Sequence, residues 1–444
     1  MYYDSLTEKI KLNQASIVVM GLGYVGLPLA CELARGGLSV MGLDPDQKKI
    51  RSVQAGESYV DYPTSETLQH ITASGALQAS VDPQVIRQAD VVIICVPTPL
   101  SKTKDPDLSL VQQAGAQIAA NQKPGQLVIL ESTSYPGTTR DLLAPLLTTG
   151  EYRAGQDVFI GYSPERIDPG NTKYNLTNTP KIVSGMTDSC ANLTHRLYFK
   201  VNEQVVRVSN PETAEMAKVL ENTFRAVNIG LANEVAIMCK RLGIDPFEVI
   251  DAAATKPFGF MPFYPGPGLG GHCIPIDPLY LSWKLRSLRS QAHFIDLADQ
   301  INQSMPRYVV NLVAEGLNSL SQSFRNSRIL IMGVTYKPDV QDMRESPALE
   351  ILDLLQKQGA VMSYQDPHVD QIEMDRETDR SGLQSCMRVV SPNYRDFDLV
   401  VIVSRHREFD LEQVLRQSRL IVDTRGVLRD QNGKNIQDKR IFRI

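Results

Sequence analysis

The sequence predicts an α/β protein with two Rossmann-like, doubly wound domains joined by a long central helix or helical domain. Three stretches predict it: a glycine-rich turn between an apolar run and a helical segment near the N-terminus, a proline-free helical segment over 212–241, and a second alternation of strands and helices after residue 327. Apolar runs that alternate with helical segments are typical of parallel sheets. We expect three domains, at 1–210, 211–320 and 321–444, since 444 residues can bury several cores.

Composition and charge exclude several classes of protein. The net charge of −4 gives no electrostatic reason to expect nucleic acid as a partner. No apolar run reaches the roughly 18 residues that span a bilayer, and the mixed, charged segment 1–14 is not a secretory signal. The six cysteines are scattered without a CxxC pair, so we expect a reducing, cytoplasmic location and no metal site.

The first predicted strand, 15–20, runs directly into a turn with the pattern GxGxxG. The turn consists of Gly21, Leu22, Gly23, Tyr24, Val25 and Gly26. A helix over 27–35 and a strand over 38–43 follow, and that strand ends at Asp44. Such a turn lets a pyrophosphate approach the helix N-terminus, and the acid suits a ribose diol, so this part predicts NAD rather than NADP. Lys49 either reaches the adenosine side or is a solvated helix residue.

Further strands over 90–96, 126–130 and 158–162 end in loops at the carboxyl edge of the predicted sheet, where ligands of such folds bind. The loop after 126–130 is rich in hydroxyls. Its Thr138 and Thr139 are expected to cap a helix, with contact to a nicotinamide as the alternative. Glu165 follows the last of these strands and is a candidate acid or base.

The segment 212–241 predicts one long helix, or two in line, that links domains or forms a dimer interface. Lys218 and Asn222 are four apart and share a face, where they either stabilise an oxyanion or are solvated. Helix is expected to continue over 243–254 and again over 279–320.

The stretch 265–278 combines several glycines with Cys273 and Asp277. Glycines allow close approach of the backbone to a ligand, and a deprotonated thiol is a good nucleophile, so the loop suits covalent chemistry. A proline- and glycine-rich turn with a half-buried structural cysteine is the alternative. His272 either lowers the pKa of the thiol or shapes the pocket, and we favour the second interpretation.

The second α/β unit is predicted from strands at 327–333, 361–365, 398–404 and 419–423 and a helix over 347–358. Its first turn has a single glycine, Gly333, so it is not a second intact dinucleotide fingerprint. Lys337 and Arg344 lie at its expected carboxyl edge, where their charges suit a second ligand that carries phosphate.

Taken together, the motifs resemble the UDP-glucose/GDP-mannose dehydrogenase family from about residue 14 to the C-terminus. The resemblance rests on GLGYVG (21–26), VPTP (96–99), EST (131–133), SPER (163–166), AEMAKVLENTFRAVNI (214–229), PGLGGHCIPIDP (267–278), GVTYKPDVQDMRESP (333–347) and VDTRG (422–426). Within the family, the stretches PERIDPGN and FGFMPFYPGPGLGGHCIPIDP look most like UDP-N-acetylglucosamine 6-dehydrogenases. The resemblance implies NAD-dependent oxidation of a UDP-N-acetylhexosamine at C6 to the uronic acid, which feeds surface polysaccharide synthesis.

The resemblance also implies roles for individual residues. Cys273 would be the nucleophile and Glu165 the acid or base, with Lys218, Asn222, Asp277 and Thr133 assisting the chemistry. The residues implied to hold NAD are Gly21, Leu22, Gly23, Tyr24, Val25, Gly26, Asp44, Lys49, Val96, Pro97, Thr98, Ser132, Thr133 and Arg344. Those implied to hold the UDP-sugar are Glu165, Arg166, Lys218, Asn222, Tyr264, Gly266, Gly268, Leu269, Gly270, Tyr336, Lys337 and Arg425.

Two positions depart from the UDP-glucose branch of the family. Pro169 stands where that branch has a second glutamate, and Pro257 stands where it has an arginine that reaches a neighbouring subunit. Several alternatives therefore stay open: UDP-glucose, UDP-ManNAc, UDP-GalNAc or GDP-mannose as substrate, a two-electron hydroxyacid-type dehydrogenase, or a sensor without activity. The expected partners are the UDP-sugar and further copies of the chain, as a homodimer or higher oligomer, and no membrane.

Overall fold

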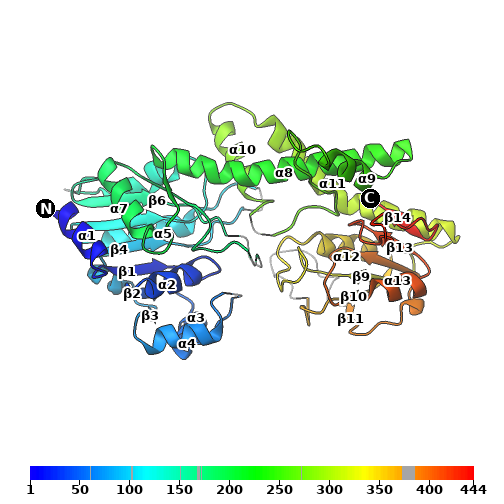
Figure 1. The fold of residues 1–444 in the computed structure, drawn as a ribbon, viewed down its shortest axis with the longest axis horizontal. Helices are drawn as coiled ribbons and strands as arrows, with labels where there is room; N and C mark the ends of the chain where they lie inside the picture. The colour runs from blue at the N-terminus through cyan, green and yellow to red at the C-terminus, as the bar shows by residue number, and fades with distance from the viewer. Residues whose placement is uncertain are drawn as a thin grey trace. The chain divides into compact units, whose positions relative to one another are not determined.

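The computed structural model describes residues 1–444 except 61, 102–103, 151, 168–170, 172, 272 and 373–385. The chain forms two compact units, the first from 1–221 with 279–290 and the second from 222–278 with 291–444. Each unit contains a sheet of parallel or mainly parallel strands, and helix α8 (Pro211–Leu242) continues from the first unit into the second (Figure 1). This confirms the predicted fold class, whereas the division into three domains stays a prediction.

The sheet of the first unit has the strand order β3-β2-β1-β4-β5-β6-β7-β8. All neighbouring strands are parallel except β6 and β7, which are antiparallel. The strands are β1 (Ser16–Met20), β2 (Ser39–Leu43), β3 (Leu77–Ser80), β4 (Val91–Ile94), β5 (Gln126–Leu130), β6 (Val158–Tyr162), β7 (Lys181–Gly185) and β8 (Val205–Arg207). The predicted strands at 15–20, 38–43, 90–96, 126–130 and 158–162 correspond to β1, β2, β4, β5 and β6.

Alternate residues of these strands support two separate cores, one on each face of the sheet. Ile17 and Val19 of β1 belong to a cluster with side chains of α1, α2, α4 and α7, while Val18 and Met20 belong to one with α5 and α6. The period of two in a strand explains the division. The helices and short turns are α1 (Tyr2–Lys11), α2 (Gly26–Arg35), α3 (Gln47–Ala55), α4 (Ser65–Ala73), η1 (Pro83–Gln88), α5 (Ser109–Asn121), η2 (Thr139–Leu143), α6 (Ala144–Leu147) and α7 (Asp188–Tyr198).

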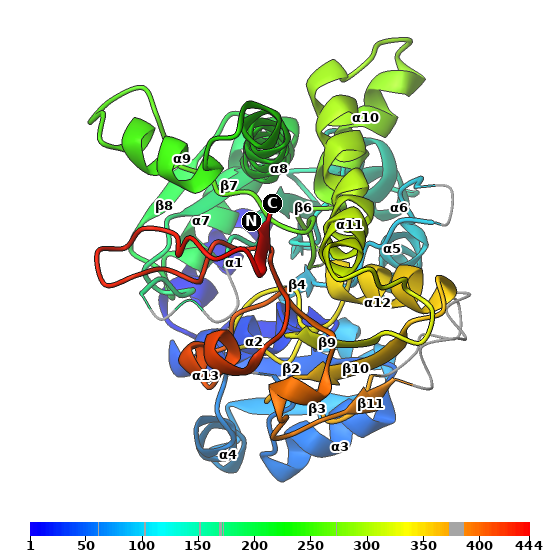
Figure 2. The same cartoon turned by 90° about the vertical axis from the view of Figure 1, so that its right-hand side faces the viewer.

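The second unit contains a parallel sheet with the order β11-β10-β9-β12-β13-β14. Helix α12 covers one face, where Ile351 and Leu352 pack with Ile329 and Ile331 of β9 (Figure 2). The strands are β9 (Arg328–Met332), β10 (Val361–Gln365), β11 (Met387–Arg388), β12 (Leu399–Ile402), β13 (Ile421–Asp423) and β14 (Ile441–Arg443). The remaining elements are α9 (Pro246–Ala254), α10 (Asp277–Ser287), α11 (His293–Ser319), α12 (Pro347–Lys357), η4 (Tyr394–Asp396) and α13 (Leu411–Gln417).

The helical segments differ from the prediction at two breaks. The expected continuation of helix over 243–254 is wrong at 243–245, because Gly243 takes a φ of +70° and Asp245 caps a new helix, α9. The expected helix over 279–320 is likewise interrupted, since Arg289 takes a φ of +57° between α10 and α11. The sequence analysis also missed helices α1, α4, α5, α6, α7 and α13 and strands β3, β7, β8, β11 and β14. The missed strands are all short.

Several large apolar side chains of α8 are exposed. They are Met216, Leu220, Phe224, Leu231 and Met238. The apolar series that predicted the helix is Met216, Leu220, Phe224, Val227 and Leu231, and four of its members are in this exposed set. The spacing therefore marks an exposed face of the chain rather than a buried one. Among the described residues, no helix is both long enough and apolar enough to cross a membrane.

Candidate active site

The three glycines of the turn between β1 and α2 have different surroundings. A Cβ on Gly21 would lie 2.7 Å from the carbonyl oxygen of Cys95, and one on Gly26 would lie 1.8 Å from that of Gly21. A Cβ on Gly23 would meet no atom within 4 Å. The first and third glycines are therefore required by packing, while the second leaves the open backbone that a pyrophosphate needs at a helix N-terminus.

Asp44 lies at the carboxyl end of β2 and is directly joined to this turn. Its Oδ2 accepts hydrogen bonds from the N–H of Leu22 at 2.8 Å and from Nζ of Lys49 at 3.2 Å, and its Oδ1 accepts one from the N–H of Asp46 at 2.9 Å. Each carboxylate oxygen has two lone pairs, so Oδ1 can accept another donor. The acid is thus held in place beside the glycine turn, with Lys49 as its ion-pair partner.

The loops after β4 and β5 are tied together at the carboxyl edge of the sheet. Ser132 donates its hydroxyl to the carbonyl of Val96 at 2.7 Å, and Tyr280 of α10 donates to the carbonyl of Thr98. Thr133 is half-buried beside Ser132. The structure therefore brings the predicted cofactor residues of both loops to one edge of the first sheet.

A buried ion cluster, which the sequence analysis missed, lies behind Glu165. Glu131 follows β5, is fully buried, pairs with Nζ of Lys181 and accepts a hydrogen bond from the hydroxyl of Tyr198 at 2.5 Å. The same Nζ lies 3.4 Å from Oε2 of Glu165. The only local signal was a charged residue at the end of an apolar strand, and the pairing of β7 beside β6, which brings in Lys181, is not visible in the sequence.

Glu165 itself is held as a carboxylate. Its Oε1 accepts the N–H groups of Arg166 at 2.7 Å and Ile167 at 2.6 Å. Burial opposes ionisation, but the charge of Lys181, the N–H of Ile167 and the charge of Lys218 outweigh it and lower the pKa of Glu165. Lys218 is buried, so this part of the site contains two of the predicted catalytic residues, Glu165 and Lys218.

The turn at 137–139 is anchored by Glu215 of α8, not by capping hydroxyls. Glu215 accepts the N–H of Gly137 at 2.6 Å and both the N–H and the hydroxyl of Thr139, at 2.9 and 2.7 Å. Thr138 donates its hydroxyl to the carbonyl of Tyr135. The expectation that Thr138 and Thr139 cap a helix is therefore wrong, because a buried carboxylate already accepts the free N–H groups of the turn.

In the second unit, the glycines of 266–271 pack against two predicted substrate residues. A Cβ on Gly266 would lie 2.5 Å from the guanidinium of Arg425, and one on Gly270 would lie 2.6 Å from Cβ of Tyr336. Gly268 has a φ of +131°, which favours glycine. The loop therefore depends on its glycines to approach Arg425 and Tyr336 closely.

Arg425 is partly removed from water without an anionic partner among the described residues. Its Nε donates to the carbonyl of Val403 at 2.9 Å, and burial lowers the pKa of its guanidinium to about 10. The group stays charged at neutral pH, and a ligand phosphate would satisfy its other donors. Tyr264, the other ring predicted to bind substrate, donates its hydroxyl to Asp251 at 2.7 Å and stacks on Phe247.

Cys273 lies in the turn before α10, where its carbonyl accepts the N–H of Asp277 at 2.8 Å. The carboxylate of Asp277 is buried and accepts Nδ2 of Asn222 at 2.5 Å. The structure therefore brings together three of the six predicted catalytic residues in the second unit. His272 and Pro169 lie outside the described residues.

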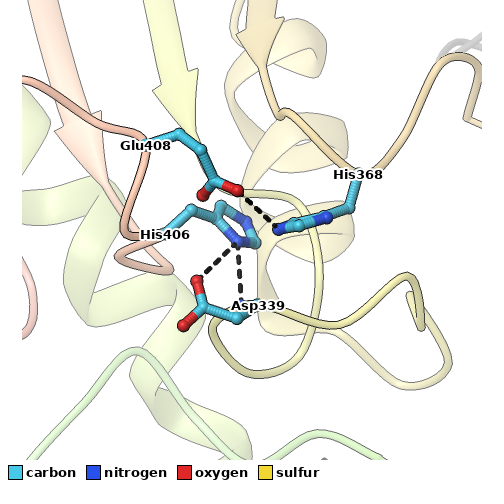
Figure 3. A group of neighbouring side chains, drawn as sticks. All are labelled: Asp339, His368, His406 and Glu408. Atoms are coloured by element: carbon cyan, nitrogen blue, oxygen red, sulfur yellow. Dashed lines mark hydrogen bonds and ion pairs between the residues drawn. The ribbon is translucent and has the colours of Figure 1, made fainter. Parts of the chain in front are cut away.

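Four side chains at the carboxyl ends of β9, β10 and β12 form a second polar cluster: Asp339, His368, His406 and Glu408 (Figure 3). Both ring nitrogens of His406 are already used, since Nδ1 accepts the N–H of Asp339 at 3.0 Å and Nε2 lies 2.9 Å from buried Asp366. Because Nδ1 accepts, Nε2 carries the proton and donates to Asp366. The cluster thus ties together the loops next to Tyr336 and Lys337 and offers no free histidine nitrogen at His406 to a metal.

Arg344 also lies in the second unit, and its guanidinium is paired with Asp342 at 2.6 Å. In the first unit, Arg166 pairs with Glu221 at 2.7 Å. Both arginines are thus held by carboxylates of their own unit, and their predicted roles toward NAD and the sugar stay predictions.

Comparison with known families identifies the chain. The NAD binding domain of the UDP-glucose/GDP-mannose dehydrogenase family matches residues 15–202, and the central and UDP binding domains of the same family match 212–304 and 330–430. The chain belongs to the UDP-glucose/GDP-mannose dehydrogenase family. As a member of this family it is an NAD-dependent UDP-sugar dehydrogenase, which confirms the predicted family, cofactor and class of enzyme.

Members of the UDP-glucose/GDP-mannose dehydrogenase family with similar sequences act on different sugars. The chain is 34% identical over 400 residues to the UDP-N-acetyl-D-glucosamine 6-dehydrogenase of Salmonella typhi, covering 90% of this chain and 91% of that protein. It is 33% identical over 432 residues to the NDP-N-acetyl-D-galactosaminuronic acid dehydrogenase of Ralstonia solanacearum, covering 95% and 98%. The solved structure of UDP-D-ManNAc dehydrogenase from Pyrococcus horikoshii matches with a TM-score of 0.84 and 31% identity over 97% of this chain and 99% of that one.

Proposed function

We propose that this dehydrogenase oxidises a UDP-N-acetylhexosamine, with UDP-GlcNAc as the preferred substrate, at C6 to the uronic acid in a four-electron reaction through Cys273. The observation that carries the proposal is the bond between Asn222 and Asp277, which ties the turn that bears Cys273 to α8. Burial raises the pKa of the Cys31 and Cys386 thiols to about 12, so these cysteines stay protonated and are poor nucleophiles. Cys273 is half-buried, as Cys386 is, and it alone of these three cysteines follows the glycine loop.

Each catalytic residue has a proposed task. Glu165, ionised at neutral pH, takes the proton of the C6 alcohol, and Lys218 stabilises the oxyanion. Sγ of Cys273 forms a C–S bond with the aldehyde carbon, so the aldehyde stays bound as a thiohemiacetal and then as a thioester. A water held by Thr133 and Asn222, with Asp277 beside the thiol, breaks the C–S bond and releases the acid.

NAD⁺, when bound, supplies the hydride acceptor, twice for each sugar. Gly23 and the N-terminus of α2 would hold its pyrophosphate, and Asp44 its adenosine ribose. The free space at Gly23 and the remaining lone pairs of Asp44 fit this assignment. The further contacts that we propose for NAD come from Leu22, Tyr24, Val25, Lys49, Val96, Pro97, Thr98, Ser132, Thr133 and Arg344.

The UDP-sugar is proposed to bind the glycine loop and the second sheet. Arg425, which lacks an anionic partner among the described residues, and Lys337 would pair with the diphosphate, and Tyr264 and Tyr336 would pack on the nucleotide or sugar. Gly266, Gly268, Leu269 and Gly270 would line the sugar, and Arg166 is a further proposed sugar contact.

Assays with individual nucleotide sugars test the preferred substrate. The purified chain is given NAD⁺ with UDP-GlcNAc, UDP-ManNAc, UDP-GalNAc, UDP-glucose or GDP-mannose, and both NADH and sugar consumption are measured. We expect the highest kcat/KM with UDP-GlcNAc and two NADH for each sugar. A higher kcat/KM with another nucleotide sugar would contradict the assignment of UDP-GlcNAc as the preferred substrate. One NADH for each sugar would indicate a two-electron dehydrogenase. No NADH with any of the sugars would indicate a sensor without activity.

Oligomeric state, location and pathway remain further proposals. The exposed apolar residues of α8 support association of identical chains, as a homodimer or higher oligomer, and light scattering after replacement of Leu220 and Phe224 by serine tests this. The six free cysteines fit a reducing cytoplasm. The uronic acid is proposed to serve surface polysaccharide synthesis.

A further inference from the structure

Three ionisable side chains lie in a row in the interior of the first unit. Glu165 is the outermost, with its side chain 12% exposed, while the side chains of Lys181 and Glu131 are 5% and 0% exposed. Nζ of Lys181 bonds Oε1 of Glu131 and lies 3.4 Å from Oε2 of Glu165. Lys181 therefore bridges the proposed catalytic base and a second carboxyl group that has no access to water.

Burial of these charges is unfavourable, and a well-packed apolar replacement of such groups is often at least as stable. Two carboxylates share a single ammonium, so the row has one excess negative charge when both are ionised. Burial raises the pKa of Glu131 to about 7, and the charge of Glu165 adds to this effect, while Lys181 and the hydroxyl of Tyr198 oppose it. The pKa of Glu165 is shifted in the opposite direction, so the inner carboxylate is the stronger base.

We propose that Lys181 and Glu131 form a proton relay that accepts the proton that Glu165 takes from the substrate. The O–H bond at Oε2 of Glu165 breaks and its proton moves to Nζ of Lys181, while one N–H bond of that ammonium breaks and its proton moves to Oε1 of Glu131. Glu165 becomes a carboxylate again, Lys181 keeps three protons, and Glu131 becomes neutral, so charge and protons balance.

The relay has a clear use in the proposed reaction, on whose assignment of Glu165 this inference rests. Oxidation of an alcohol to a carboxylate in water releases several protons, so one base has to act repeatedly. Because Glu131 can accept the proton inside the protein, Glu165 becomes a carboxylate again before it exchanges a proton with solvent. At acidic pH Glu131 is already protonated and accepts no further proton. The activity is therefore expected to rise with pH as Glu131 loses its proton near pH 7.

Three conservative variants test the relay in the full chain. Glu131→Gln keeps the shape but accepts no proton, and Lys181→Arg keeps the charge but cannot release one. Both are expected to lower kcat by about tenfold or more while KM for NAD⁺ is unchanged. Tyr198→Phe removes a hydrogen bond that lowers the pKa of Glu131, so the rise of kcat with pH is expected to move to higher pH. If Glu131, Lys181 and Tyr198 had a purely structural role, the pH at which kcat rises would not change.

A titration without substrate separates this inference from the proposed function. Infrared spectra of the carboxyl band are recorded between pH 5 and 9 for the natural chain, Glu131→Gln and, as a control, Glu8→Gln at an exposed position. We expect a buried carboxyl group that titrates near pH 7 and is missing only in Glu131→Gln. Absence of this band in the natural chain would overturn the relay, as would full kcat in both Glu131→Gln and Lys181→Arg. If the band is present but no nucleotide sugar is oxidised, the proposed function fails and with it the use of the relay.

Discussion

The amide of Asn222 donates to the carboxylate of Asp277 at 2.5 Å, and this bond joins the middle of α8 to the first residue of α10. Both side chains are buried, so the hydrogen bond between them is shielded from water. The turn that contains Cys273 is therefore positioned by a residue more than fifty positions earlier in the chain.

Asn222→Ala should destabilise the chain by about 1–3 kcal/mol, because it removes a hydrogen bond to the buried carboxylate of Asp277. Urea unfolding measures the loss. Asn228→Ala is the matched control, since the amide of Asn228 is half-buried and donates to the carbonyl of Phe224 in its own helix, and it should change stability by less than about 0.5 kcal/mol. Equal losses of unfolding free energy in the two variants would contradict a stabilising role for the bond between Asn222 and Asp277.

Gly23→Ala and Gly26→Ala should have opposite effects on binding and folding. A methyl group on Gly23 meets no protein atom, so the fold should be unchanged while KM for NAD⁺ rises by about tenfold or more. A methyl group on Gly26 overlaps the carbonyl of Gly21, which should lower stability by about 1–3 kcal/mol or more. Thermal melts and NAD⁺ titrations check both variants, and an unchanged KM in Gly23→Ala would exclude pyrophosphate from this turn.

Asp44→Ala should reduce the preference for NAD⁺ over NADP⁺. The carboxylate hydrogen-bonds a ribose diol and repels a 2′-phosphate, so its loss should lower kcat/KM with NAD⁺ by about tenfold and raise the relative activity with NADP⁺. Lys49→Met is the companion variant, because it leaves the acid in place. If the natural chain uses both cofactors equally, Asp44 has no such role.

The stability of the chain should fall as pH rises through about 7, because of Glu131. The pKa of this carboxyl is raised from 4.5 to about 7 in the folded state, so its contribution is complete below about 4.5 and is lost as pH rises through 7. One pKa unit is worth about 1.4 kcal/mol, so we expect a loss of about 1–3 kcal/mol. Glu131→Gln should flatten this slope in urea unfolding between pH 5.5 and 8, whereas an unaltered slope would contradict the raised pKa.

The sequence predicted the parts of the site that depend on neighbouring residues. The turn from Gly21 to Gly26 and Asp44 were found because strand, turn, helix and acid follow one another along the chain. Cys273 was predicted because the glycines that mark its loop lie next to it in the sequence. Lys181 and Glu215 were missed because their partners Glu131 and Thr139 lie 50 or more positions away, on strands or turns whose pairing leaves no periodic signal.

Helix boundaries show the same limit. The apolar spacing of 212–241 predicted α8. Gly243, which follows α8, is an ordinary helix stop signal that the prediction overlooked, whereas Arg289 after α10 has no such signal. Arg289 in particular is not a residue that favours this conformation, so only the packing of the surrounding segments explains the break. The exposure of Leu220 and Phe224 is also decided by tertiary structure, because spacing alone does not distinguish a core face from a surface face.

The role of Cys273 is the central claim, and the Cys273→Ser variant tests it most directly. The variant is incubated with NAD⁺ and UDP-GlcNAc, binding of both is measured by calorimetry, and the uronic acid is measured by mass spectrometry. We predict that both ligands bind with their natural affinities and that no acid accumulates, because a serine hydroxyl does not replace the thiolate in the C–S bond. Acid formation at the rate of the natural chain would contradict the covalent mechanism.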